Sequence, residues 1–484
     1  MTQTFPIYIN GQWEDMADHP TFEQRCPANL DEVTGLWPAS TRGDAQRAIE
    51  AAQEAFGPWS RWTVQRRAAI LKVAHEAMKR RRDEFAEILT RENGKTLTES
   101  RTEIDSAILE MEFQIHEGVR VYGQTAPSSM DGVFAYSTRQ PLGVVAIISP
   151  WNFPFNVPGR KITPALMAGN TCVFKPASLT PQTGLKFVEL FVEAGLPAGV
   201  LNFITGSGGT LGHELVTHSL VKAISFTGST QVGRQIHQQA ARNMTRTQLE
   251  MGGKNASVVL EDADLDQAAE AVAKAAFACA GQWCTSTSRA IVIHGVAAEF
   301  RERVLELTRQ IKVGNGMDPA VAMGPVCGTQ QLESILDYLK MGKEEGATLL
   351  CGGGRMTGGE YKKGCFVEPT LFADVQPEMR IAQEEIFGPV LSIMEVADFE
   401  QALQVANQVD FGLSSSIFTS DLQKAFTFLE ETEVGLAHVN LMTAVKEPHL
   451  SFGGVKASGF GLPEAGHTGI EFFSEHKVAY VKYR

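Results

Sequence analysis

The sequence predicts an α/β protein built on parallel β-sheets that carry helices on both faces. Short apolar strands alternate with amphipathic helices from residue 142 to residue 243, which is the pattern of a covered parallel sheet. A second stretch, from about residue 255 to residue 450, contains further strands of the same kind. The 484 residues exceed one ordinary hydrophobic core, so two or three folding units are expected.

The expected elements follow one another in a regular order. Two segments with helical spacing and strong helix formers come first, at 44–57 and 63–92. The alternation then gives strands at 142–150, 170–177, 199–206 and 221–228, and helices at 159–169, 180–195, 208–218 and 229–243. Gly169 is expected to close the first of these helices. The second stretch has strands at 256–262, 289–295, 390–396 and 413–420, and neither core obviously needs the strand-like segments 134–142 and 474–483.

Composition and charge exclude several classes of protein. The 43 basic and 56 acidic residues give a net charge of -13, which would repel nucleic acid and anionic membranes. The seven cysteines include no Cys-x-x-Cys pair, so no metal site is expected. The amino terminus has no signal-peptide pattern, and no apolar stretch is long enough to cross a bilayer. A reducing cytoplasm is therefore the expected location, and it disfavours disulfides.

Two turns of the first stretch could bind a phosphate, because helix amino termini attract anions at the carboxyl ends of parallel strands. The turn "TGSGGTLG" contains Gly208 and Gly212, in a spacing one residue off the common dinucleotide fingerprint. The turn "SFTGSTQVG" ends a strand at Phe226, and its Ser229 could cap the next helix or contact a phosphate. Two such turns after adjacent strands favour a dinucleotide site over plain turns.

Cys284, in "GQWCTSTSR", is a candidate nucleophile. A thiol that attacks a carbonyl needs a route to the thiolate, a donor for the oxyanion and a base for a later water. Asn152 follows a buried strand and could donate its amide, and Glu250 precedes two glycines that would let its carboxylate approach a ligand. Taken singly, the three residues could equally be a core cysteine, a turn residue and a surface acid.

The order of the motifs resembles that of the aldehyde dehydrogenase superfamily. The motifs are "SPWNFP", "VFKPAS", "FTGST", "LEMGGKN", "GQWCTSTSR", "EEIFGPV" and "SFGGVKASGFG". The likeness extends from "YINGQW" at residues 8–13 to the last strand. It implies that Cys284 is the catalytic nucleophile and that Cys279 is a packed bystander.

The resemblance also implies roles for individual residues. Asn152 and the backbone of Cys284 would form the oxyanion hole, and Glu250 would activate the water that hydrolyses a thioester. Glu464 resembles a carboxylate that is sometimes assigned to a proton relay. The residues expected to bind NAD or NADP are Ser149, Trp151, Lys175, Ser178, Gly208, Gly212, Phe226, Ser229, Glu385 and Phe387.

The fold implied by the resemblance has three parts. A Rossmann-like dinucleotide-binding domain would take residues 1–119 and 142–252, and an α/β catalytic domain would take 253–465. A small β oligomerisation unit would join 120–141 to 466–484 and account for the two unassigned strands. A strand that adds to another subunit's sheet protects its edge, so a homodimer or homotetramer is expected. Non-catalytic structural proteins and cofactor-independent thiol esterases are the alternatives of another class.

Two residues bear on the substrate and the cofactor. Arg160 resembles an arginine of semialdehyde-oxidising members, although an arginine paired with an internal acid is the alternative. The segment "VNLMTAVKEPHLSFGG" looks closer to 2-oxoglutarate-semialdehyde (2,5-dioxopentanoate) dehydrogenases than to succinate-semialdehyde dehydrogenases, and Ala278 stands where the latter often have an arginine. A broad-specificity enzyme is a further alternative. Ser178 stands where NAD-preferring members often have glutamate, so NADP should be accepted at least as well as NAD.

Overall fold

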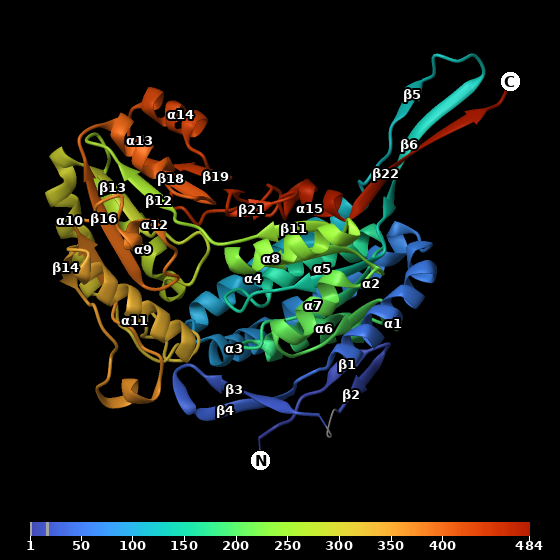
Figure 1. The fold of residues 1–484 in the computed structure, drawn as a ribbon, viewed down its shortest axis with the longest axis horizontal. Helices are drawn as coiled ribbons and strands as arrows, with labels where there is room; N and C mark the ends of the chain where they lie inside the picture. Colours follow the sequence, from blue (N-terminus) through green and yellow to red (C-terminus); the bar gives the residue numbers. More distant parts are fainter. Residues whose placement is uncertain (1, 16–18) are drawn as a thin grey trace.

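The protein consists of two α/β bodies and a β-arm that projects from one of them (Figure 1). A computed structural model describes residues 2–15 and 19–484. The blue-to-green part of the chain forms one body, and the yellow-to-orange part forms the other. Within the described part of the chain, no helix combines the length and the apolar character that crossing a membrane requires.

The first body is built on an eight-stranded sheet in the order β2-β1-β9-β8-β7-β10-β11-β21. Its five central strands are parallel, as the alternating pattern predicts, and antiparallel strands lie at both edges. The strands are β1 Ile7–Ile9, β2 Gln12–Glu14, β7 Val144–Ile148, β8 Thr171–Lys175, β9 Leu201–Phe203, β10 Val221–Thr227, β11 Arg246–Glu250 and β21 Gly459–Phe460.

Helices cover both faces of this sheet. One apolar layer joins the sheet to α1, α7 and α8, and a second joins it to α2–α6. The bounds are α1 Arg42–Ser60, α2 Val64–Arg80, α3 Arg82–Asn93, α4 Leu97–Gly118, α5 Asn156–Ala168, α6 Pro181–Glu193, α7 Gly208–Thr217 and α8 Thr230–Ala240. Gly169 ends α5 with a φ of 98°, a left-handed conformation that glycine adopts without strain.

The segment 63–92 forms two helices rather than one. Arg81 interrupts it with a φ of -101° and a ψ of 16°. Its guanidinium donates to Glu84 within α3 and to Glu193 at the end of α6, so acids on two helices neutralise Arg81.

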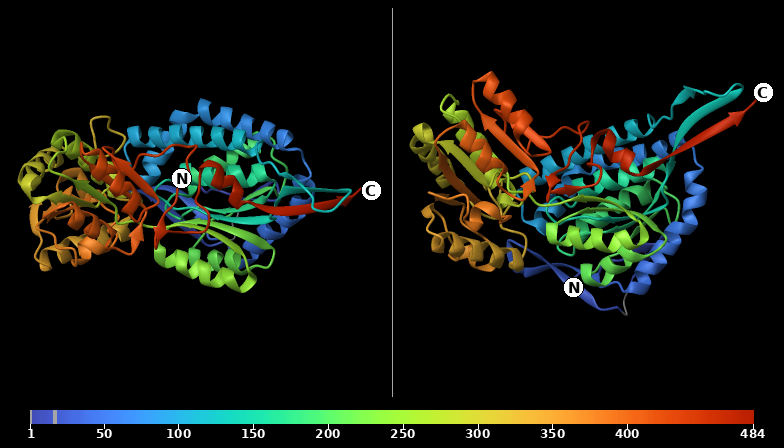
Figure 2. Two further views of the ribbon diagram at one scale, coloured as in Figure 1. Left: turned by 90° about the horizontal axis from the view of Figure 1, so that it is seen from above. Right: turned by 45° about the horizontal axis from the view of Figure 1, so that its top comes forward.

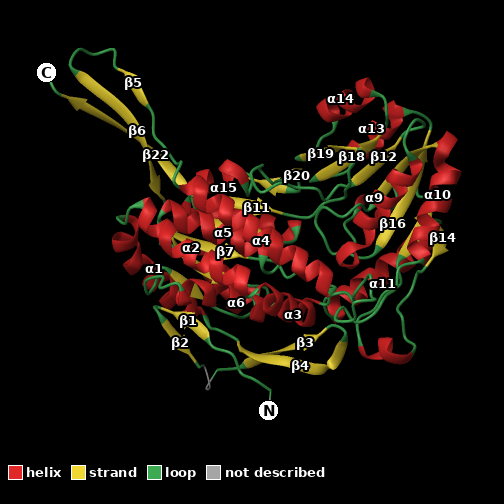
Figure 3. Ribbon diagram, turned by 180° about the vertical axis from the view of Figure 1, so that it is seen from behind, coloured by secondary structure: helices red, strands yellow, loops and turns green. Residues whose placement is uncertain are grey.

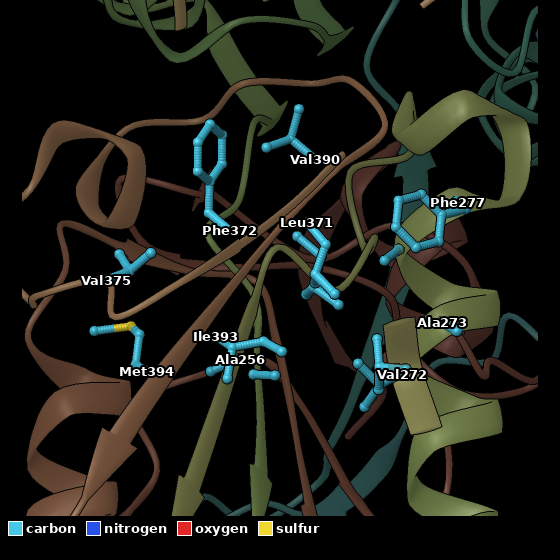
Figure 4. Packing of buried hydrophobic residues seen from close by; sticks show 14 of the residues in the cluster. Ala256, Val272, Ala273, Phe277, Leu371, Phe372, Val375, Val390, Ile393 and Met394 are labelled. Atoms are coloured by element: carbon cyan, nitrogen blue, oxygen red, sulfur yellow. The ribbon is translucent and has the colours of Figure 1, made fainter. Parts of the chain in front are cut away.

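The second body contains a seven-stranded sheet in the order β14-β15-β16-β13-β12-β18-β19, parallel except at β14. Figure 4 shows part of its core, where Val272 and Phe277 of α9 face Leu371 and Ile393 of the sheet. The strands are β12 Ala256–Val259, β13 Arg289–Ile293, β14 Thr348–Cys351, β15 Thr370–Ala373, β16 Val390–Val396, β18 Ser414–Phe418 and β19 Leu436–Val439. The helices are α9 Leu265–Phe277, α10 His294–Arg309, α11 Thr329–Glu344, α12 Arg380–Gln383, α13 Phe399–Asn407 and α14 Leu422–Glu431.

The two unassigned strands pair with each other in the arm. β22 (Ser474–Lys482) runs antiparallel to β6 (Val133–Pro141) along its whole length, and β5 (Thr125–Pro127) completes a three-stranded sheet. α15 (Gly466–Phe472) leads into β22, and the arm carries the carboxyl terminus away from both bodies (Figure 2).

Short elements complete the chain (Figure 3). A hairpin of β3 (Thr21–Cys26) and β4 (Asn29–Pro38) lies at the end of the molecule opposite the arm, and β17 (Phe411–Gly412) pairs with β20 (Val455–Lys456). The 3-10 helices are η1 Ala241–Asn243, η2 Ala278–Gly281 and η3 Gly359–Lys363. A division of the chain at residues 252 and 465 would not follow the sheets completely. β21 lies in the segment 253–465 but pairs with β11 in the eight-stranded sheet of the first body. The domain limits themselves stay a prediction.

Candidate active site

A cavity of about 1120 Å³ lies between the two bodies and brings the main predicted residues together. The first body contributes segments that follow the carboxyl ends of β7, β10 and β11, and the second contributes the loops around Cys284 and Glu385. The predicted residues that line it are Trp151, Asn152, Arg160, Ser229, Glu250, Cys284, Glu385, Phe387 and Glu464, together with Cys279.

A strained turn and an amide hold the loop of Cys284 in place. Cys279 and Ala280 of η2 both have a φ of 53°, which is costly for residues with a side chain. Glu99 of α4 supports this turn, because its Oε1 accepts a hydrogen bond of 2.6 Å from the Cys279 N–H. Beyond the turn, Asn255 donates from Nδ2 to the carbonyl oxygens of Cys284 and Ser286, at 2.8 Å each.

The Cys284 thiol lies in a mostly apolar and acidic environment. It packs beside Leu413, Phe452 and Ala465. Burial raises its pKa to about 12, the guanidinium of Arg160 opposes this shift, and nearby carboxylates add to it. The resting group is therefore a neutral thiol, and forming the nucleophile requires a base.

Asn152 is buried in the loop between β7 and α5 and points its amide toward the Cys284 loop. The side-chain Nδ2 of Asn152 donates to the Gln282 backbone carbonyl at 3.1 Å. The backbone carbonyl of Asn152 accepts from the Lys95 ammonium at 2.7 Å. An amide nitrogen has two N–H donors. One N–H is therefore used for positioning and the other remains for an oxyanion in the cavity.

Glu250 ends β11 and is almost fully buried. Its Oε2 accepts a weak bond of 3.3 Å from the Gly454 N–H. Burial raises the pKa of Glu250 well above its usual range, and the neighbouring Glu464 raises it further. A carboxyl group with a raised pKa is a stronger base once ionised, which suits proton abstraction near neutral pH.

Arg160 lies on α5, one helical turn after that helix begins at Asn156, and Asn152 lies in the loop before the helix. Its Nε donates to the Asn156 side chain at 3.1 Å. Glu110 and Glu464 are 3.8 and 3.9 Å from its guanidinium nitrogens, beyond hydrogen-bond distance. The Arg160 Nη1 is buried without a hydrogen-bond partner among the described residues. Two internal carboxylates therefore lie near Arg160, but they leave its Nη1 without a hydrogen-bond partner among the described residues.

Glu464 is held more firmly than Arg160. It contacts the Lys161 ammonium directly and accepts a bond of 3.0 Å from the Thr227 hydroxyl. Lys161 in turn donates to Ser225 at 2.9 Å. Glu464 is thus fixed beside Glu250 by a buried cation.

Several predicted cofactor residues gather at one end of the cavity. Ser229 caps α8 by accepting from the Val232 N–H, so the amino terminus of this helix faces the cavity. Glu385 accepts from the Gly253 N–H at 2.9 Å, and a Cβ on Gly252 would lie 2.0 Å from its carboxylate. This close approach explains Gly252, and a Cβ on Gly253 would lie 2.9 Å from the Cys284 carbonyl oxygen. Burial raises the pKa of Glu385 to about 7.

The aromatic rings of Trp151 and Phe387 meet edge to face at this same end, with centroids 5.4 Å apart. An anion, a ribose and a flat ring could be held by a helix terminus, a carboxylate and aromatic side chains of this kind.

The other predicted cofactor residues do not line this cavity. Ser149, Lys175 and Ser178 lie where β7 and β8 end, and the Ser149 N–H donates to the Lys175 carbonyl at 3.3 Å. Burial lowers the pKa of Lys175 to about 8. Gly208 begins α7 and Gly212 lies within it. Phe226 is part of the apolar core beneath the β10–α8 turn, which gives it a structural role, and a direct cofactor contact stays a prediction.

Sequence reasoning missed three residues of the site. Asn255 belongs to the motif "LEMGGKN", which could have drawn attention to it, but its contacts with the Cys284 loop are tertiary. The sequence around Glu99 predicts a helix capping box with Thr96, which the structure contains. That local role gave no reason to expect the second contact of Glu99, with the Cys279 turn. Lys446 lines the cavity from the loop between β19 and β20; it lies in the segment "VNLMTAVKEPHLSFGG" that bears on the substrate, but the residue itself was not singled out.

Comparison with known proteins places this site in a family. The sequence model described as the aldehyde dehydrogenase family matches residues 13–479. Alpha-ketoglutaric semialdehyde dehydrogenase of Bacillus subtilis is 43% identical over 479 residues, covering 99% of this chain and 98% of that protein.

Two solved structures share the fold over nearly the full length. Betaine aldehyde dehydrogenase of Staphylococcus aureus, in complex with NAD+, has a TM-score of 0.96 and 33% identity, covering 99% of this chain and 95% of that one. A 3,6-anhydro-L-galactose dehydrogenase in complex with NADP has a TM-score of 0.96 and 36% identity, covering 99% and 100%.

Proposed function

Because this chain belongs to the aldehyde dehydrogenase family and is an NAD(P)-dependent aldehyde dehydrogenase, we propose that its substrate is a short ω-oxo acid. The five-carbon 2-oxo acid, 2-oxoglutarate semialdehyde (2,5-dioxopentanoate), is favoured over succinate semialdehyde. The observation that carries the proposal is Arg160, a buried guanidinium in the cavity of Cys284 with one nitrogen unpartnered among the described residues. The printed name of the 43% identical relative, a semialdehyde dehydrogenase, supports it.

The proposed reaction begins at Cys284. After its proton passes to a base, for which Glu250, one of the carboxylates that act on Cys284 and line the same cavity, is the candidate, the thiolate adds to the aldehyde carbon and forms a thiohemiacetal. The free N–H of Asn152 and the backbone N–H of Cys284 donate to the oxyanion. Bound NAD(P)+ would supply the acceptor for the hydride of the former aldehyde carbon, and a thioester would then remain on Cys284.

Hydrolysis of the thioester is assigned to Glu250. The ionised carboxylate takes a proton from a water, whose oxygen attacks the thioester carbon. The carbon–sulfur bond then breaks, the carboxylic acid leaves, and the Cys284 thiolate is regenerated. Glu464, which Lys161 holds, is proposed to pass the proton onward from Glu250.

The proposed cofactor contacts divide into two sets. Trp151, Ser229, Glu385 and Phe387 would hold the pyrophosphate, ribose and nicotinamide parts within the cavity. Ser149, Lys175, Ser178, Gly208, Gly212 and Phe226 would act at the carboxyl ends of β7–β10, with Lys175 near a ribose hydroxyl. NADP is proposed to serve at least as well as NAD, because Ser178 brings no negative charge to this edge.

The proposal extends to assembly and location. The arm of β5, β6 and β22 is proposed to join the chain into a homodimer or homotetramer, with residues 120–141 and 466–484 as its oligomerisation unit. Residues 1–119 and 142–252 would then be the cofactor domain and 253–465 the catalytic domain. All seven cysteines are free, which supports a reducing cytoplasm.

The test of the substrate is Arg160→Met, measured on 2-oxoglutarate semialdehyde and on pentanal, a neutral aldehyde of equal length. Loss of a charge-assisted contact should cost about 1.5–3 kcal/mol in transition-state stabilisation for the acid alone. Arg160→Lys keeps the charge without the planar pair of donors and should recover only part of it. Equal losses of kcat/KM on both aldehydes would show that Arg160 is structural and would remove the semialdehyde assignment.

A further inference from the structure

A second cation, Lys446, faces the cavity beside Arg160. It lies in the loop between β19 and β20, and both residues line the cavity of Cys284. Their charges act on each other, since Arg160 lowers the pKa of Lys446, although burial is the larger cause. Lys446 is also close enough to Cys284 for the two charges to interact. Lys446, Arg160 and Cys284 thus line one cavity.

A single buried carboxylate, Glu110 of α4, lies between the two cations. Its Oε1 accepts a hydrogen bond of 2.6 Å from the Lys446 ammonium and is 3.8 Å from the Arg160 Nε. Glu110 is almost fully buried, whereas about a fifth of the Lys446 side chain, 21%, is exposed. Glu110 thus holds Lys446 from the protein side and leaves its other side toward the cavity.

The cluster holds two cations around one carboxylate, and the Oε2 of Glu110 has no hydrogen-bond partner among the described residues. Two cations share Glu110, because Glu464 is already in contact with Lys161 and lies 3.9 Å from Arg160. An ammonium has three N–H donors, and in the described structure only the bond to Glu110 uses one of them. With the unpartnered Nη1 of Arg160, donors on two side chains remain for an anionic ligand.

We propose that Lys446 is a specificity-determining residue that binds the 2-oxo-acid end of the substrate together with Arg160, with Glu110 as its positioning residue. This inference rests on the proposed function and deepens it. A 2-oxo acid presents its ketone oxygen next to a carboxylate, so it offers acceptors to two separate donors. Arg160 binds the carboxylate, and Lys446 bridges the ketone oxygen and the carboxylate. A simple ω-oxo acid lacks the ketone and leaves part of Lys446 unused, which disfavours it.

The alternative is that Lys446 only neutralises Glu110. Because the two roles predict different substrate dependence, they can be separated by Lys446→Met on three aldehydes: 2-oxoglutarate semialdehyde, succinate semialdehyde and pentanal. The expected result is a loss of kcat/KM of about tenfold or more on the 2-oxo acid, a smaller loss on succinate semialdehyde and little change on pentanal. An equal loss on all three, or no loss on the 2-oxo acid, overturns the proposal.

Two further variants control for the fold and the charge. Lys446→Met leaves Glu110 buried without its partner, so the double variant Lys446→Met/Glu110→Gln removes both charges and should show the same substrate ranking. Lys424→Met is the matched control, since Lys424 pairs with Glu261 at 2.9 Å outside this cavity. It should leave kcat/KM unchanged on all three aldehydes.

An inhibition measurement separates this proposal from the proposed function. With pentanal as the substrate, 2-oxobutanoate and butanoate are compared as inhibitors of the wild type and of Lys446→Met. The inhibition constant of 2-oxobutanoate should rise about tenfold in the variant, and that of butanoate should rise less. This result would support Lys446 even if the wild type did not prefer ω-oxo acids. Equal shifts for the two inhibitors would overturn the role of Lys446 even if that preference held.

Discussion

At the scale of one residue, burial raises the pKa of the Glu250 carboxyl group and so affects the pH at which it can act as a base. Its pKa is raised by burial and by Glu464, so at a given pH a larger fraction of the group is protonated, and unable to accept a proton, than in an ordinary carboxyl group. Its ionised fraction, and with it the rate of thioester hydrolysis, should rise with pH through that raised pKa. Steady-state kcat of the wild type should therefore increase from acid pH toward neutrality.

Glu250→Gln tests this role directly. If the main function of Glu250 is hydrolysis of the thioester, the variant should release a burst of reduced cofactor of about one equivalent per active site and then stall. Stopped-flow absorbance of the reduced nicotinamide measures both phases. A slow burst would instead assign Glu250 to forming the Cys284 thiolate. Steady-state turnover equal to that of the wild type, with the same rise with pH, would exclude both roles.

Single residues differ in how well the sequence predicts them. Cys284, Asn152 and Glu250 could be proposed because each has a side chain that suits one chemical step and stands in a recognisable motif. Asn255, Glu99 and Lys446 were missed even though Asn255 and Lys446 lie in quoted segments, because the contacts that give them their roles join segments far apart in the chain. Lys446 meets Glu110 across 336 residues. Only the fold makes such a pair visible.

At the scale of elements, the parallel strands were the most predictable part. All five residues of β8 are buried, as are four of the five in β7; β7 is a continuous apolar run, and β8 is apolar at its three central residues, Cys172, Val173 and Phe174. Boundaries set by tertiary contacts were not predictable. The break at Arg81 follows from its pairing with acids on two helices, and β21, two residues long, exists only because β11 offers it an edge.

The connection between β8 and α6 carries a prediction about the cofactor. The Ser178 hydroxyl donates to the Gly206 carbonyl at 3.0 Å, so its proton already has an acceptor and its contribution is the absence of charge. Ser178→Glu should lower kcat/KM with NADP by roughly tenfold or more through repulsion of the 2′-phosphate, with a smaller effect on NAD. Ser178→Ala, which removes the hydrogen bond without adding charge, is the control. A hundredfold preference of the wild type for NAD would contradict the prediction.

At the scale of the whole molecule, the arm is the feature that a single chain does not explain. β22 forms one edge of its three-stranded sheet, and apolar side chains on it are exposed, among them Val478 at 55% and Tyr480 at 67%. A long apolar edge strand in water invites pairing with another chain. β22 pairs with β6 along its whole length, and the assignment of these segments to one oligomerisation unit stays a prediction.

The arm therefore gives the last prediction, which concerns assembly. Val478→Asp/Tyr480→Asp places two charges on the exposed face of β22, and burying them in a subunit interface without partners would cost several kcal/mol. The variant should shift toward the 52.7 kDa of one chain in sedimentation or light scattering, with its secondary structure kept. Val73→Asp is the matched control, because Val73 is a 52% exposed apolar residue of α2 outside the arm. An arm variant with the same mass as the wild type would show that assembly, if any, uses another surface.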